Sequence, residues 1–336
     1  MQPNPFPFDV SGFSLKDAAA RPLTDFLPLV VSVPVFAGVR KAITKAIYKV
    51  ALRHGYRDDI SRKLGDSMFY FLQYTTLFFL GFVQACRDGV YLDRLEFVRH
   101  MPDAPPWRPM YQVLAMAQLT QYIVSFLMIL IDSRRNYKDF AAMCIHHTVV
   151  LVILVPAYRS GHYLWTEFIC SVSDFSDIWL ELSKVVNYTV GEPLSAVTFS
   201  IFTVSFLGLR LVYLQWHLVP LWTMIAEFLP YQGWGPERDM WPPLYAVVFA
   251  LNVWWSCLIV KMIFGIFKGE IRGDIRDDAE AAAGFCADNK VTNRSASLLQ
   301  SYQGHTPIMA CGSEAEVGIV IDRANVMAKE TKTKTE

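Results

Sequence analysis

The chain has 336 residues, of which 53% are hydrophobic and 18% are charged, with equal numbers of basic and acidic residues. Soluble globular proteins carry roughly 25% charged residues, so this composition argues against an ordinary soluble enzyme and against a disordered chain. A formal net charge of zero provides no global field that would attract nucleic acid, and we expect no nucleic-acid partner. The six cysteines form no C-x-x-C pair, which is typical neither of a structural zinc site nor of a disulfide framework.

Seven apolar runs have about the length, roughly 20 residues, that a helix needs to cross a bilayer. They cover residues 25–44, 67–86, 109–131, 140–158, 161–182, 194–216 and 243–267. Pro28 and Pro34 interrupt the first run, and the fourth and fifth runs contain histidine and acidic residues. The pattern predicts an all-α integral membrane protein with about seven transmembrane helices, which together form one domain over residues 25–267.

Lysine and arginine are concentrated in alternate loops and in the segment after the seventh run. The positive-inside rule places these basic segments in the cytosol, so residues 1–24 are expected to be a lumenal segment. Residues 268–336 are rich in charge, Ala, Ser and Thr, which predicts a mostly disordered cytosolic tail. Lys332 and Lys334 stand fifth and third from the end, in a pattern that resembles a dilysine retrieval signal for the endoplasmic reticulum.

Ionisable side chains within the predicted spans gather at one depth. Such groups cost roughly 2.5–3.5 kcal/mol each on insertion, so each is a functional candidate. At the helical rise, His146 and His147 lie about 10 Å from the cytosolic start of the fourth span. Asp177 and Asp174 lie about 10 and 15 Å from the cytosolic end of the fifth span, which runs the other way. Two adjacent helices are therefore expected to bring two histidines and two carboxylates together.

Helical spacing refines this prediction. Asp174, Asp177, Glu181 and Lys184 form one stripe along the fifth span, and we expect the last two to pair near the cytosolic face. The two adjacent histidines point about 100° apart, so they cannot face one centre equally. One is expected to face the reacting group, and the other to orient it or to relay protons.

The residues of this cluster leave several interpretations open. An imidazole can act as a general base or as a nucleophile in acyl transfer, with a carboxylate that fixes its tautomer. A single zinc ion held by His and Asp is a less favoured alternative, and a di-iron centre is disfavoured because the chain has only seven histidines. A polar network that merely joins two helices is the third interpretation. We expect neither a bound metal nor a cofactor.

Other polar and aromatic residues in the spans give weaker signals. Arg210 is placed near the lumenal end of the sixth span, where it could contact substrate or snorkel to the interface. Gln118 and Gln121 are expected to form hydrogen bonds between helices. Trp254 and Trp255 are expected to serve as packing residues or interfacial anchors.

A basic loop lies between the third and fourth spans, directly above the histidine pair. It contains Arg134, Arg135 and Lys138. The loop can be the ordinary positive-inside signal, or it can dock a phosphate-bearing substrate such as coenzyme A.

The stretch from Arg134 to Tyr188 resembles the signature of the ceramide synthases, acyltransferases of the TLC-domain family. Their pattern is a basic K-D-F, then M, then H-H and, after a gap of fixed length, H-D-x-S-D-x-x-x-E-x-x-K-x-x-x-Y. The matching residues here are Lys138, Asp139, Phe140, Met143, His146, His147, Asp174, Ser176, Asp177, Glu181, Lys184 and Tyr188. Ser173 departs from the pattern, because the family has histidine there. Fainter resemblance extends over residues 60–267, and the interval 45–66 is too short for the homeobox-like domain of some animal members.

The resemblance implies N-acylation of a sphingoid base, sphinganine or sphingosine, by a fatty acyl-CoA in the endoplasmic reticulum membrane. It implies that His146 is closest to the thioester, that His147 handles a second proton, and that Asp174 and Asp177 orient the imidazoles. The residues expected to bind substrate are Arg134, Arg135, Lys138, Lys184 and Arg210. The implied partners are acyl-CoA as a substrate, the sphingoid base, membrane lipids and, in a homo- or hetero-oligomer, further subunits. The competing hypothesis is a non-enzymatic TLC-domain protein that handles lipids or assists translocation.

Overall fold

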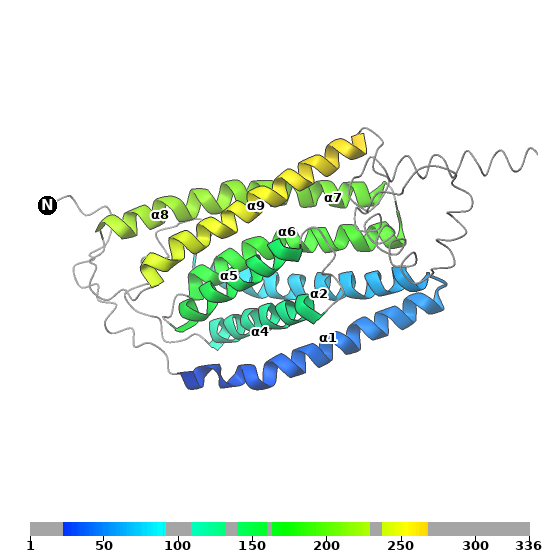
Figure 1. Cartoon of the computed structure of the whole chain (residues 1–336), viewed down its shortest axis with the longest axis horizontal. Helices are drawn as coiled ribbons and strands as arrows, with labels where there is room; N and C mark the ends of the chain where they lie inside the picture. The colour runs from blue at the N-terminus through cyan, green and yellow to red at the C-terminus, as the bar shows by residue number, and fades with distance from the viewer. Residues whose placement is uncertain are drawn as a thin grey trace, which may run out of the picture. The chain divides into compact units, whose positions relative to one another are not determined.

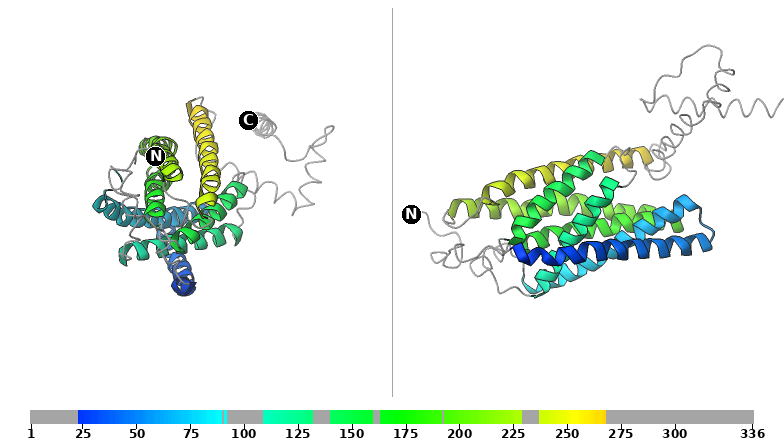
Figure 2. Two further views of the ribbon diagram at one scale, coloured as in Figure 1. Left: turned by 90° about the vertical axis from the view of Figure 1, so that its left-hand side faces the viewer. Right: turned by 60° about the horizontal axis from the view of Figure 1, so that its bottom comes forward.

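The computed structural model describes residues 23–89, 91, 109–131, 140–159, 163–191, 193–228 and 237–267. Every regular element in these ranges is helical, and the helices lie side by side with their axes roughly along one direction (Figures 1 and 2). The elements are η2 (Leu23–Phe26), α1 (Leu27–Arg53), α2 (Asp58–Arg87), α4 (Pro109–Ile131), α5 (Phe140–Arg159), α6 (Tyr163–Thr189), α7 (Leu194–Ser205), η4 (Phe206–Tyr213), α8 (Leu214–Phe228) and α9 (Glu237–Phe267). The predicted tail and the predicted lumenal segment up to residue 22 lie outside the described residues.

The predicted class of fold, an all-α membrane protein with about seven spans, is confirmed. Six of the described helical segments are long and apolar enough to cross a membrane. They are α1, α2, α4, α5, the continuous stretch from α7 into α8, and α9. The remaining long helix, α6, has 27 residues but contains two glutamates, Glu167 and Glu181, besides the predicted aspartates, and Lys184 is its one cation.

The helix α6 carries five charged residues, Glu167, Asp174, Asp177, Glu181 and Lys184. A helix with this many charges needs protein rather than lipid around it. The structure provides it, because α6 packs against α2, α4, α5, α7 and η4 (Figure 1). The helix that carries the predicted aspartates therefore has protein on most of its sides.

Three helices extend well past the predicted ends of their spans. α1 continues to Arg53, α2 begins at Asp58, and α6 ends at Thr189. An apolar cluster joins these extensions, with Ala51, Leu64 and Val185 buried and Ile47, Tyr56, Met68 and Tyr188 packed around them. Hydropathy detects the part of a helix that faces hydrocarbon, whereas these extensions are stabilised by packing of the three helices against one another.

The sixth predicted span is not one regular α-helix. It is formed by α7, the π-helix η4 and the start of α8 in unbroken succession. π-helical turns are rare and frequently occur at functional sites, because an extra residue in the turn redirects the side chains around it. Arg210 lies in η4, within the turns whose side chains are redirected.

Candidate active site

The histidine pair lies on α5, about two turns after Phe140. The two imidazole rings are 5.5 Å apart between centroids and nearly perpendicular, at 87°, as expected for neighbours on a helix. His147 is buried, and its Nδ1 lies 2.9 Å from the carbonyl oxygen of Met143. A carbonyl oxygen can only accept, so Nδ1 is the donor and the neutral ring keeps its lone pair on Nε2.

Aromatic side chains from two other helices surround His146. Trp255 of α9 meets its ring edge to face at 5.3 Å between centroids. Tyr122 of α4 lies 6.4 Å from the His146 ring and 5.8 Å from the His147 ring. Within the described residues, no hydrogen-bond partner reaches the buried Nδ1 of His146. Trp255 was expected only to pack or to anchor, and Tyr122 was not predicted, although it lies one turn after Gln118 on α4.

Asp174 of α6 is 2% exposed and is held by a chain of glutamines. Nε2 of Gln118 donates to Oδ2 of Asp174 at 3.2 Å, and Nε2 of Gln121 donates to Oε1 of Gln118 at 2.7 Å. Nε2 of Gln73 on α2 donates in turn to Oε1 of Gln121. We call Gln73, Gln121 and Gln118 the glutamine chain. It confirms that Gln118 and Gln121 form hydrogen bonds between helices, and it adds Gln73, which was not predicted.

Asp177 is paired with Arg210, whose Nη2 donates to its Oδ1 at 2.6 Å. The same guanidinium donates from Nε to Oγ of Ser176 at 2.9 Å and from Nη2 to the carbonyl oxygen of Ser173 at 3.0 Å. It also lies 4.6 Å from the centre of the Phe206 ring. The prediction that Arg210 lies near the lumenal end and can snorkel is therefore wrong. Arg210 is buried at the level of Asp177, where a carboxylate, a hydroxyl and a carbonyl satisfy its donors.

The helix α4 connects the histidines to the buried carboxylate, because Gln118 and Tyr122 are four residues apart on one of its faces. Gln118 binds Asp174, and Tyr122 contacts both imidazoles. Within the described residues, neither aspartate forms a hydrogen bond with either histidine, so the structure differs from the expected direct orientation of the imidazoles. The physical reason is that α5 packs mainly against α4 and α9 rather than against α6.

The remaining predicted site residues are Lys184 and the three cations of the basic loop. Lys184 forms the predicted ion pair with Glu181, one turn away on α6. The basic loop with Arg134, Arg135 and Lys138 lies outside the described residues, so its docking role stays a prediction. No three His, Cys, Asp or Glu side chains of the described residues lie close enough together to hold a metal ion.

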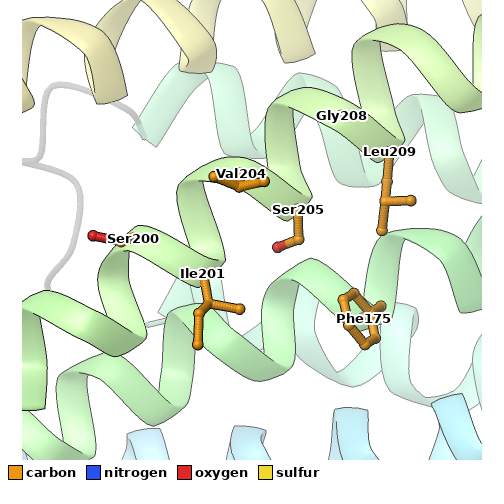
Figure 3. Close-up of a pocket in the computed structure, with 7 residues that line it drawn as sticks. All are labelled: Phe175, Ser200, Ile201, Val204, Ser205, Gly208 and Leu209. Atoms are coloured by element: carbon orange, nitrogen blue, oxygen red, sulfur yellow. The ribbon is translucent and has the colours of Figure 1, made fainter.

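A separate apolar groove lies between α6 and the stretch formed by α7 and η4 (Figure 3). Its volume is about 590 Å³, and its lining residues are Phe175, Ser200, Ile201, Val204, Ser205, Gly208 and Leu209. None of the predicted site residues lines it. The groove is therefore distinct from the polar site.

Comparisons with known proteins identify the family of the chain. Residues 63–261, more than half of the chain, match the model of the TLC domain. The chain is 30% identical over 159 residues to ceramide synthase LOH2 of Arabidopsis thaliana, covering 44% of this chain and 51% of that protein. It is 32% identical over 178 residues to ASC1-like protein 3 of Oryza sativa subsp. japonica, covering 49% and 60%. It is 27% identical over 256 residues to ceramide synthase 5 of Mus musculus, covering 73% and 59%.

The chain spans between 51% and 60% of the length of these curated relatives. The region that matches the family model contains both histidines, both aspartates and Arg210. The helices that build the candidate active site are thus those of the matched domain, and the chain belongs to the TLC domain family.

Proposed function

We propose that the chain is a ceramide synthase, which transfers a fatty acyl group from acyl-CoA to the amine of a sphingoid base. The observation that carries this proposal is a histidine pair at membrane depth, linked through α4 to a buried carboxylate. The similarity to curated proteins named ceramide synthase supports it. The reaction joins two amphiphiles, so a polar site enclosed by membrane-spanning helices suits both substrates.

The imidazoles supply the proton transfer that the reaction needs. The amine nitrogen forms a bond to the thioester carbonyl carbon, the carbon–sulfur bond breaks, and coenzyme A leaves as the thiol after one proton passes from nitrogen to sulfur. His147 is oriented for this role, since its Nδ1 is held by the Met143 carbonyl and its Nε2 can accept a proton. His146 acts either as a nucleophile that forms an acyl-imidazole or as the base that deprotonates the amine.

The carboxylates of α6 have unequal partners. Arg210 compensates the charge of Asp177, and Lys184 compensates that of Glu181. Among the residues that the structure describes, the donor to Asp174 is the neutral amide of Gln118. We therefore assign to Asp174 the ammonium of the incoming sphingoid base, and to the pair of Asp177 and Arg210 the fixing of α6 against η4.

The acyl-CoA is expected to approach from the cytosolic side. Its phosphates would dock at the basic residues near the start of α5, with Lys184 as a further cation. The thioester would then reach the histidines about 10 Å below Phe140. We place this reaction in the endoplasmic reticulum membrane, where the predicted dilysine signal would retain the protein.

The test is N-acylation by the purified full-length protein in detergent, with sphinganine and a panel of acyl-CoAs. We expect product from the unmodified protein and none from His146→Ala or Asp177→Ala. The control is His54→Ala, which removes an exposed histidine at the end of α1. Acyl label trapped on His147→Ala but not on His146→Ala would support the covalent route, and label on neither would favour direct transfer.

Folding must be measured beside activity in every variant, by elution profile and thermal unfolding. Failure to form product with any acyl-CoA, from a folded protein that still binds lipid, would overturn the proposal. The chain would then be a lipid-handling member of the family, and the polar cluster would be structural.

A further inference from the structure

The helix α1 lies at the edge of the bundle, where it packs mainly against α2 and α4 (Figures 1 and 2). Its outward face changes character along its length. In the first half that face is apolar, with Val31, Val35 and Val39 exposed by 65%, 57% and 46%. In the second half it is basic, with exposed cations at Lys41, Lys45, Lys49 and Arg53. We call these four residues the basic stripe.

The spacing keeps the basic stripe on one side of the helix. A step of four residues turns the side chain by only about 40° at 3.6 residues per turn. The four cations therefore occupy the same outward half of α1 as the exposed valines, rather than the half that packs on α2. Along α1, the apolar outward surface is therefore followed directly by the basic stripe.

The stripe stands at the boundary of the membrane. α1 has 27 residues, so it is about 40 Å long, whereas the hydrocarbon layer is about 30 Å thick. Since the first half of its outward face is apolar, the excess length lies at the basic end. The excess of about 10 Å places Lys49 and Arg53 beyond the hydrocarbon, and Lys45 and Lys41, one and two turns deeper, can extend their long side chains toward the headgroup layer.

The positive charge of the stripe is not compensated by nearby acids. Three carboxylates occur at this end of α1 and α2, and each is already paired. Asp58 binds Arg62 at 2.5 Å, Asp59 binds Arg57 at 2.8 Å, and Asp66 lies 3.5 Å from Arg40. In the described part of the chain, no acidic side chain pairs with any member of the basic stripe.

We propose that the basic stripe is a binding site for the headgroups of anionic phospholipids in the leaflet at this end of the bundle. The positive-inside rule assigns this end to the cytosolic leaflet, which is the anionic one. A rigid helix that packs on α2 presents the four cations toward the lipid phosphates, so no ordering of a flexible segment is needed. Each cation near an anionic surface contributes about fivefold in binding.

The test uses the full-length protein in phosphatidylcholine nanodiscs that contain a minor fraction of phosphatidylserine, with retained lipid quantified by native mass spectrometry. We expect the variant Lys41→Gln/Lys45→Gln/Lys49→Gln to bind phosphatidylserine roughly a hundredfold more weakly. The variant with arginine at the same three positions is expected to bind as the parent does. The control Arg57→Gln/Asp59→Asn removes an ion pair without changing the net charge and is expected to alter binding by less than about twofold.

Three outcomes would overturn the proposal. The first is unchanged phosphatidylserine binding by the glutamine variant, and the second is equal loss in the arginine variant, which would indicate a defect of shape rather than of charge. The third is displacement of the lipid by inorganic phosphate more strongly than by chloride at equal ionic strength, which would show a site for soluble phosphate. If the glutamine variant fails to fold, the parent protein still tests the proposal. Binding through charge requires that its affinity for phosphatidylserine falls as the salt concentration rises.

Discussion

At the scale of single residues, the imidazole and the two carboxylates of the site are each held by a different kind of partner. His147 is fixed by a backbone carbonyl, Asp174 by an amide, and Asp177 by a guanidinium. The hydrocarbon layer provides no bulk water for such groups, so an absent partner costs more there than at a wet surface. The glutamine chain is therefore a means of stabilising a buried carboxylate without a second charge.

The variant Gln118→Leu tests this role. It removes the donor of Asp174 and the acceptor of Gln121, and we expect it to lower the free energy of unfolding by about 1–3 kcal/mol. Turnover in the N-acylation assay is expected to fall more than tenfold, because Asp174 loses its fixed position. Gln73→Leu, at the far end of the chain, should have a smaller effect on turnover. Equal losses of turnover in Gln118→Leu and Gln73→Leu would contradict the expectation that the effect decreases along the glutamine chain away from Asp174.

At the scale of helices, close packing in this bundle depends on residues without side chains. At Gly65 of α2, a Cβ atom would lie 2.9 Å from the carbonyl oxygen of Thr44 on α1. A backbone atom cannot move aside as a flexible side chain can, so the close approach of α1 and α2 requires glycine here. At Gly38 of α1 the space is open, and no atom lies within 4 Å of the added Cβ.

The two glycines form a matched pair for measurement. Gly65→Ala is expected to destabilise the bundle by about 1–3 kcal/mol, because α1 must shift away from α2. Gly38→Ala is expected to be neutral or to stabilise by up to about 1 kcal/mol, since alanine favours the helix over glycine. Thermal unfolding in one detergent compares the two variants. A stabilising effect of Gly65→Ala would show that the two helices are not in this contact.

At the scale of the whole molecule, the helices between residues 23 and 267 contain the site, whereas the predicted sorting signal lies at the other end of the chain. Activity and location are therefore expected to be separable. Changing Lys332 and Lys334 together tests this separation in the full-length protein.

The variant Lys332→Ser/Lys334→Ser, tagged at its N-terminus, is expected to leave the endoplasmic reticulum for later secretory compartments. The purified variant should keep its N-acylation activity, because the change is remote from the histidines in sequence. Fluorescence microscopy and the acylation assay measure the two properties. The control Arg323→Ser/Lys329→Ser removes the same charge from the tail and should stay in place, and escape of both variants would refute a specific signal.

Some features of this protein follow from its sequence alone. The spans could be placed because hydropathy is a property of one segment, and the helical rise within each span led to the expectation that the histidines and the aspartates lie at a similar depth. The pairing of Glu181 with Lys184 was predictable because both lie on one helix. The family was indicated by the order and spacing of the residues between Lys138 and Tyr188.

Contacts between helices were decided only by the tertiary structure. The rotation of α5 toward α4 and α9 placed Trp255 on His146 and kept the imidazoles from direct hydrogen bonds with the carboxylates of α6. The π-helix η4 brought Arg210 to Asp177 rather than to the interface. Apolar periodicity shows that a helix has neighbours, but it does not show how the helix is rotated against each of them, and that rotation determines which polar groups meet.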